Sequence, residues 1–287
     1  MLKFGTKTLV AAATAAAVSL AASPASAQVK IGWTAWSDAE FVTKLARQVL
    51  EDRVGEDVKL IQTDIAPQYQ GVAQGDIDVM LMSWLPSTHS DYMKKTQANT
   101  VNLGILYDHA RLGWIVPTYM DIDSISDLKN EDVAESLNGT ITGIDPGAGL
   151  TRLSKKTIEA YGLGEMYDLQ TSSGAGMTAA LKRATRNEEP IVVTGWSPHW
   201  KFGAYDLKYL EDPKGTLGSF ERIHAIARQG FYQENIDAAM TLARMWIPLD
   251  DLQAAMYDAQ ETSYEEAVDK YVENNEKRVN YWVTGKL

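Results

Sequence analysis

The chain has 287 residues, a formal net charge of −11 and a hydrophobic content of 45%. This length and composition allow one large or two modest domains and exclude a generally disordered chain. The acidic balance argues against nucleic acid or an anionic lipid surface as a partner. The absence of cysteine excludes disulfides, thiol chemistry and a lipid-modified cysteine.

Residues 1–27 have the composition of a secretory signal peptide. Lys3 and Lys7 precede an alanine-rich apolar run, and a small-residue cleavage motif, ASA, ends at Ala27. The run is too weakly apolar to supply the roughly 20 strongly apolar residues that a membrane anchor requires. We therefore expect cleavage after Ala27 and, in a bacterium with two membranes, export of an untethered protein to the periplasm.

The remaining chain begins with a predicted strand and helix. Residues 29–33 predict a short strand, and the helix that follows has an apolar stripe at four-residue spacing: Phe41, Leu45 and Val49. Ser37 and Glu40 have the spacing of a capping box, as do Ser263 and Glu266 near the other end of the chain. We therefore expect helices to begin at Ser37 and Ser263.

Strands and helices continue to alternate along the chain. Further strand patterns are found at 58–64, 77–84, 140–145 and 190–196, with extended segments at 103–108 and 112–120. Helices are predicted between them, and the last sixty or so residues are predicted to be helical. This alternation predicts an α/β architecture with mostly parallel sheets. Two extended segments, 113–120 and 223–231, are candidates for crossings between two lobes.

Three tryptophans follow or end predicted strands: Trp36, Trp84 and Trp196. In α/β sheets, ligands bind beyond the carboxyl ends of the strands, although a single buried tryptophan is more often part of a core. That all three fall at such ends favours a ligand site. Several tryptophan faces around one cavity suit a quaternary ammonium group, which each face attracts by about 0.5–2 kcal/mol.

Such a cage alone does not reach the roughly 8 kcal/mol of micromolar binding, so a second anchor is expected. The glycine-rich turn before residue 150 opens a predicted helix, whose free N–H groups can hold an anion. His89 lies five residues after Trp84 and can donate a hydrogen bond to a carboxylate. The alternatives are a simple tight turn and a structural histidine. The turn lacks the G-x-G-x-x-G pattern of a dinucleotide site.

Catalysis is not expected. The segment GWSPH lacks the final glycine of a nucleophile elbow, and the four histidines show no metal-ligand spacing. No pair of carboxylates is distinguished by its surroundings. We therefore expect a protein that is not an enzyme and has no metal or cofactor.

The motifs SWLPSTH, GIDPGAG and GWSPHW occur in this order along the chain. In this combination they resemble the glycine betaine-binding proteins of osmoprotectant ABC transporters, the OpuAC-like family, and the resemblance extends over essentially the whole chain after residue 27. It implies the two-lobed α/β fold of type II periplasmic binding proteins, with the ligand in the cleft between the lobes. We expect residues 28–116 plus 226–287 to form lobe 1 and residues 117–225 to form lobe 2.

The resemblance also implies roles for individual residues. The three tryptophans would form a prism around a trimethylammonium group. His89 and the backbone N–H groups of Gly149 and Leu150 would hold a carboxylate. Lobe 1 would supply Trp36, Trp84 and His89, and lobe 2 would supply Gly149, Leu150 and Trp196. Trp33 stands where relatives commonly carry tyrosine or another residue, so it either lines the pocket or packs beneath it.

Several alternatives stay open at this point. The two possible roles of Trp33 leave the pocket volume undetermined. The choice of ligand therefore stays open among glycine betaine, proline betaine, a sulfonium analogue such as dimethylsulfoniopropionate, and choline. Trp200 and His199 are expected to stiffen the loop after Trp196. The expected partner of this monomer is the membrane permease of an ABC transporter, with a periplasmic sensor as the alternative.

Overall fold

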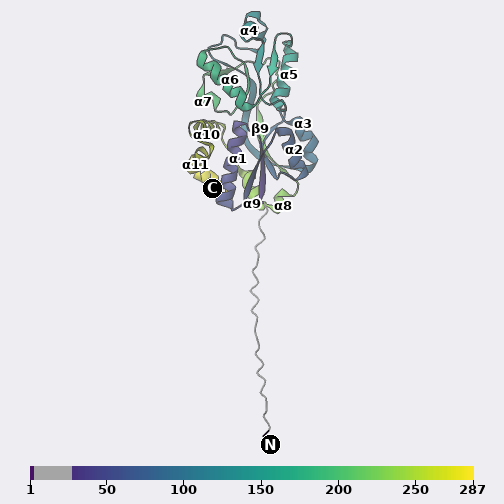
Figure 1. The fold of residues 1–287 in the computed structure, drawn as a ribbon, viewed down its shortest axis with the longest axis vertical. Coiled ribbons are helices and arrows are strands. Elements are labelled where there is room, and N and C mark those ends of the chain that lie inside the picture. Colours follow the sequence, from purple (N-terminus) through teal and green to yellow (C-terminus); the bar gives the residue numbers. More distant parts are fainter. Residues whose placement is uncertain (3–27) are drawn as a thin grey trace.

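The computed structural model describes residues 1–2 and 28–287, which excludes nearly all of the expected signal peptide and its cleavage site. From Gln28 onward the chain forms two lobes arranged along its long axis (Figure 1). Helices α4, α5, α6 and α7 surround one lobe, and α1, α2, α3, α8, α9, α10 and α11 surround the other (Figure 1). No helix within the described residues is long and apolar enough to span a membrane.

The strands of both lobes are connected in the order β2-β1-β3-β9-β4-β7-β5-β6, with β8 beside β4. Their bounds are β1 Val29–Trp33, β2 Val58–Gln62, β3 Val79–Leu85, β4 Thr100–Pro117, β5 Thr140–Thr142, β6 Asp168–Gln170, β7 Val193–Ser197, β8 Leu207–Tyr209 and β9 Glu221–Arg228. We call the part built on β1, β2, β3 and β9 lobe 1, and the part built on β5, β6, β7 and β8 lobe 2.

Strand β4 belongs to both lobes. Residues from Thr100 to Ala110 pair with β9, whereas residues from Arg111 to Pro117 pair with β7 and β8. Strand β9 pairs only with β3 and β4, so the chain has returned to lobe 1 by Glu221. Both crossings therefore come before the expected lobe boundaries. Strand β4 pairs with lobe 2 from Arg111, ahead of the boundary at 117, and β9 pairs with lobe 1 from Glu221, ahead of the boundary at 226.

The expectation of mostly parallel sheets is wrong. Pairs β1–β2, β1–β3, β5–β6 and β5–β7 are parallel. Pairs β3–β9, β4–β9, β4–β7 and β4–β8 are antiparallel. Every antiparallel pair contains β4 or β9, the two strands that connect the lobes, so a local strand-helix pattern predicts each lobe but not the crossing strands.

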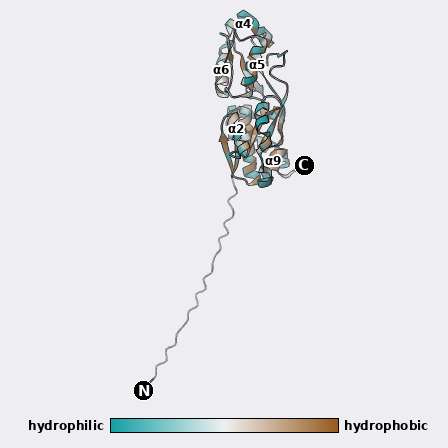
Figure 2. Ribbon diagram, turned by 90° about the vertical axis from the view of Figure 1, so that its right-hand side faces the viewer, coloured by the Kyte–Doolittle hydropathy of each residue, from teal (hydrophilic) through white to brown (hydrophobic). Residues whose placement is uncertain are grey.

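The helices before β2, β3, β6 and β7 and the helical C-terminal region lie close to their predicted positions, whereas three short helices, after β3, before β5 and after β7, were not predicted. The bounds of the helices are α1 Ser37–Val49, α2 Ile65–Gln74, α3 Ser90–Thr96, α4 Glu131–Ser136, α5 Gly149–Tyr161, α6 Gly174–Asn187, α7 Lys201–Ala204, α8 Phe231–Glu234, α9 Ile236–Arg244, α10 Leu249–Glu261, α11 Tyr264–Asn274 and α12 Glu276–Thr284. Hydrophilic and hydrophobic residues alternate along them (Figure 2), which is typical of helices with one face on a core.

Helix α1 buries its predicted apolar stripe of Phe41, Leu45 and Val49. The predicted cap at Ser37 is wrong, because Trp36 is the N-cap residue and its carbonyl accepts the Glu40 N–H at 2.8 Å. Ser37 is thereby the first residue of the helix.

The second predicted cap is confirmed. The Ser263 hydroxyl accepts the Glu266 N–H at 3.1 Å at the start of α11. This helix packs beside α1, where the rings of Phe41 and Tyr271 lie 5.9 Å apart. The C-terminal helices thus cover α1, the helix that begins at Ser37.

Candidate ligand-binding site

A small cavity lies where the two lobes meet. All six residues predicted to bind a ligand line it, together with five others. The complete lining is Trp36, Asp38, Trp84, Thr88, His89, Leu112, Ile144, Ala148, Gly149, Leu150 and Trp196. Trp33, at the end of β1, is not part of this lining.

The three tryptophans of the cavity come from different elements. Trp36 precedes α1, Trp84 lies near the end of β3, and Trp196 lies near the end of β7. All three are buried, and the rings of Trp36 and Trp196 lie 6.4 Å apart at an interplanar angle of 60°. We call these three residues the tryptophan cage. By contrast, Trp114 is buried away from the cavity and donates to the Ser154 hydroxyl at 3.0 Å, as a core residue does.

Two indole N–H groups of the tryptophan cage cross from one lobe to the other. Trp36 of lobe 1 donates from Nε1 to the Asp145 carboxylate of lobe 2 at 2.9 Å. Trp196 of lobe 2 donates from Nε1 to the Asp38 carboxylate of lobe 1 at 2.9 Å. Each bond fixes the plane of a ring that faces the cavity. The ring planes of Trp36 and Trp196 are therefore held by bonds that require the lobes to be together.

Asp38 is fully buried and lines the cavity. Its second oxygen accepts the Tyr107 hydroxyl at 2.6 Å. Burial raises the pKa of Asp38, and the hydrogen bonds from Tyr107 and Trp196 oppose this change. Sequence reasoning missed Asp38 and Asp145, although Asp38 follows Trp36 by two residues and Asp145 stands in the GIDPGAG motif.

His89 is buried at the N-cap position of α3, and its ring lies 6.1 Å from that of Trp36, nearly parallel to it. Its Nδ1 accepts the Trp84 backbone N–H at 3.1 Å, so the neutral ring carries its proton on Nε2. Burial and the nearby Arg152 lower the pKa of His89 to about 3. The residue is therefore a neutral hydrogen-bond donor at ordinary pH.

The first two residues of α5, Gly149 and Leu150, lie opposite this histidine-bearing loop. The first N–H groups of a helix have no partner within the helix, and the helix dipole places partial positive charge there. Gly149 also allows a close approach of the lobes, because a Cβ on it would lie 2.5 Å from both Cγ2 and the carbonyl oxygen of Thr88. Both residues thus offer backbone donors next to the cavity.

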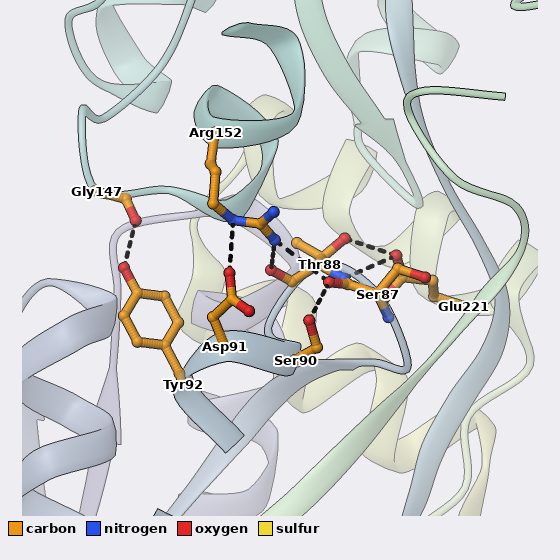
Figure 3. Close-up of polar contacts among 8 residues, drawn as sticks. All are labelled: Ser87, Thr88, Ser90, Asp91, Tyr92, Gly147, Arg152 and Glu221. Carbon is orange, nitrogen blue, oxygen red and sulfur yellow. Dashed lines mark hydrogen bonds and ion pairs between the residues drawn. The ribbon is translucent and has the colours of Figure 1, made fainter. Parts of the chain in front are cut away.

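Polar contacts join the two lobes near Thr88, which lines the cavity (Figure 3). Arg152 of α5 donates to the Thr88 carbonyl at 3.0 Å and lies 3.5 Å from the Asp91 carboxylate. The Tyr92 hydroxyl donates to the Gly147 carbonyl at 2.8 Å. Within lobe 1, Glu221 of the returning strand accepts the Thr88 hydroxyl at 2.6 Å and so holds the loop that meets lobe 2. The structure is therefore in a closed arrangement of the lobes.

The loop after Trp196 contains the second tryptophan of the GWSPHW motif. His199 is buried, with its ring 4.8 Å from that of Trp196 and 5.3 Å from that of Trp200. Its Nδ1 accepts the Lys201 backbone N–H at 3.2 Å. Trp200 and His199 thus pack behind a cage residue and lie outside the lining of the cavity.

Residues 27–274 match the family described as the substrate binding domain of ABC-type glycine betaine transport systems. The chain belongs to this family. The resemblance carried by the three motifs is thereby confirmed, and so is the expectation of an ABC-transport binding protein.

One relative named for glycine betaine transport is similar to about half of this chain. A glycine betaine/carnitine transport binding protein of Listeria monocytogenes is 40% identical over 157 residues, which cover 54% of this chain and 52% of that protein. The matched region is thus about half the length of that relative.

Two solved structures share the fold over 90% of this chain. The lactococcal OpuAC, crystallised closed with glycine betaine, has a TM-score of 0.84 at 38% identity and is covered to 99%. A glycine betaine/L-proline-binding protein of Borrelia burgdorferi has a TM-score of 0.84 at 30% identity and is covered to 97%. The predicted two-lobed, type II periplasmic binding protein fold is confirmed.

Proposed function

We propose that this member of the glycine betaine family captures glycine betaine in the cavity between its lobes. The trimethylammonium group lies against the tryptophan cage, where each ring face contributes about 0.5–2 kcal/mol. The carboxylate accepts hydrogen bonds from Nε2 of His89 and from the backbone N–H groups of Gly149 and Leu150. Charge-assisted hydrogen bonds of this kind contribute about 1.5–3 kcal/mol each.

One observation carries this proposal: a single cavity is lined by all three cage tryptophans and by all three candidate carboxylate donors. Neither set is sufficient alone, since a ring cage attracts any trimethylammonium and a set of donors accepts many carboxylates. Together they suit a small zwitterion with its charges at opposite ends. The family and the glycine betaine bound to the lactococcal relative support the same ligand.

The same proposal includes delivery and location. After cleavage at Ala27, the monomeric protein moves freely in the periplasm and presents its closed, loaded form to the permease of an ABC transporter. It catalyses no reaction. Support comes from the family, which serves transport, and from a 22% identical relative in Salmonella typhimurium described as a periplasmic protein. A sensor that reads the loaded form is the alternative partner, and betaine uptake by a deletion strain distinguishes the two.

Calorimetric titration of residues 28–287 tests the ligand, with glycine betaine, proline betaine, carnitine, choline and dimethylsulfoniopropionate as probes. We expect glycine betaine to bind at least about 100-fold more tightly than choline, a difference of about 2.7 kcal/mol. Choline presents the same trimethylammonium group, but its hydroxyl satisfies fewer donors, and a buried unpaired donor costs about 1–3 kcal/mol. Equal affinities, or no binding of glycine betaine, would contradict the proposal.

A further inference from the structure

Lys201 is a fully buried lysine directly behind the tryptophan cage. It is the first residue of α7, and its Nζ donates to the Trp196 carbonyl at 3.0 Å. The same nitrogen lies 4.9 Å from the ring centroid of Trp196 and 4.9 Å from that of Phe202. A carbonyl oxygen and two ring faces are surroundings that stabilise an ammonium group.

The strand beside Lys201 leaves room for its side chain. A Cβ on Gly195 would lie 3.1 Å from Cε and 3.2 Å from Nζ of Lys201, and would also collide with the end of Ile115. The glycine before Trp196 therefore allows the lysine to reach the cage.

The opposing charge comes from the other lobe. Asp38 accepts the Trp196 indole N–H at 2.9 Å, so Trp196 bonds to the carboxylate through its ring and to the ammonium through its carbonyl. Burial lowers the pKa of Lys201 well below its ordinary value, and the carboxylate of Asp38 opposes this change. An amine and a carboxyl group thus lie on either side of one residue of the cavity, and the carboxylate favours the ammonium form of the amine.

We propose that Lys201 balances the charge of Asp38 and thereby makes the cavity select a net-neutral zwitterion over a net cation, an inference that rests on the proposed function. Asp38 alone would give the cavity a negative field, which favours choline over glycine betaine. Both ligands present the same ammonium to the cage, so the effect of Lys201 at that end cancels in a comparison of the two. The remaining effect of Lys201 is its longer-range attraction for the carboxylate of glycine betaine, which choline lacks.

The readout is the ratio of the choline dissociation constant to the glycine betaine dissociation constant. Lys201→Met removes the charge at similar length, and Lys201→Gln removes it while keeping a donor. We expect each substitution to lower the ratio by up to about tenfold, the order of a longer-range unit-charge interaction at an effective dielectric constant of about 20. Asp38→Asn, which keeps the size and an acceptor for Trp196, should raise the ratio.

Phe202→Leu is the matched control, because Phe202 contacts the same ammonium and carries no charge. Phe202→Leu should leave the ratio unchanged even if both affinities fall. If the role of Lys201 were purely structural, the Lys201 variants would leave the ratio unchanged in the same way. An unchanged ratio in Lys201 variants that still bind glycine betaine would overturn this inference and leave the proposed function intact. A lower ratio in Asp38→Asn would do the same. Wild-type protein that binds neither ligand would instead overturn the proposed function.

Discussion

The indole N–H of Trp36 donates to the Asp145 carboxylate across the cleft at 2.9 Å. Asp145 belongs to lobe 2 and does not line the cavity. The bond therefore links the orientation of a cage ring to the closure of the lobes. A ligand that prefers this ring orientation also prefers the closed state, because a ligand shifts an equilibrium by its differential affinity for the two states.

Asp145→Ala should weaken glycine betaine binding about tenfold, although Asp145 is not expected to contact the ligand. The reason is the loss of a charge-assisted hydrogen bond of about 1.5 kcal/mol that exists only in the closed form. Asp145→Asn keeps an acceptor oxygen and should stay close to the wild type. Calorimetric titration measures both variants, and equal affinities in all three proteins would show that this bond does not contribute to closure.

Substitution of the tryptophan cage should separate ligand contact from general stability. Trp36→Ala, Trp84→Ala and Trp196→Ala should each weaken binding by about 1–2 kcal/mol or more, from lost cation–π attraction and lost contact area. Trp246→Ala is the control, because Trp246 is exposed and lies outside the lining of the cavity. If the three cage variants bind as tightly as Trp246→Ala in calorimetry, the cage is not the ammonium site.

The tryptophans, His89 and the start of α5 could be predicted because strand ends, motifs and a helix start are local features of the sequence. The acceptors of the cage N–H groups could not. Trp36 and Asp145 are separated by 109 residues, and Trp196 and Asp38 by 158 residues. Their pairing depends on how two lobes meet, which no local periodicity encodes.

The fold, like the site, has parts that local sequence patterns predict and parts that depend on how the lobes are connected. Strands and helices within each lobe follow from their apolar patterns, but the antiparallel strands β4 and β9 depend on the path between lobes. The cap at Ser37 was mistaken for a related reason. Trp36 takes the N-cap position while its indole is held by the other lobe, a tertiary contact that overrides the local preference for serine.

Stability should depend on pH through His89, which is neutral in the fold. Its pKa is about 3 in the folded chain against about 6.5 when unfolded. Between these values the unfolded state binds more protons, so the free energy of unfolding falls as the pH is lowered from about 6.5 toward 3. This residue contributes a slope of up to about 1.4 kcal/mol per pH unit, and stability at higher pH is unaffected by it.

Denaturant unfolding at several pH values measures this slope in the wild type and in His89→Gln. The glutamine has no group that titrates in this range, so its slope between pH 4 and 6 should be smaller by up to about 1.4 kcal/mol per pH unit. The comparison removes the contribution of other titrating residues, His199 among them, whose pKa burial also lowers. Parallel curves for the two proteins would mean that His89 is not held neutral by the fold.

Two glycines of the GIDPGAG motif offer a sharp test of closure. A Cβ on Gly149 would lie 2.5 Å from Cγ2 and from the carbonyl oxygen of Thr88 on the opposite lobe, whereas a Cβ on Gly147 would meet nothing within 4 Å. Gly149→Ala should therefore hold the lobes apart and weaken glycine betaine binding at least about tenfold, since overpacking costs about 1–3 kcal/mol. Gly147→Ala should bind normally, because the carbonyl that Tyr92 contacts is retained.

X-ray scattering with saturating ligand distinguishes the mechanism from simple damage to the site. The wild type and Gly147→Ala should become more compact when glycine betaine is added, and Gly149→Ala should stay extended while its unfolding free energy without ligand is unchanged. That last result is expected because the three atoms nearest to the added Cβ all belong to Thr88 of lobe 1. A Gly149→Ala protein that compacts and binds like the wild type would show that the first turn of α5 does not need this close approach to Thr88.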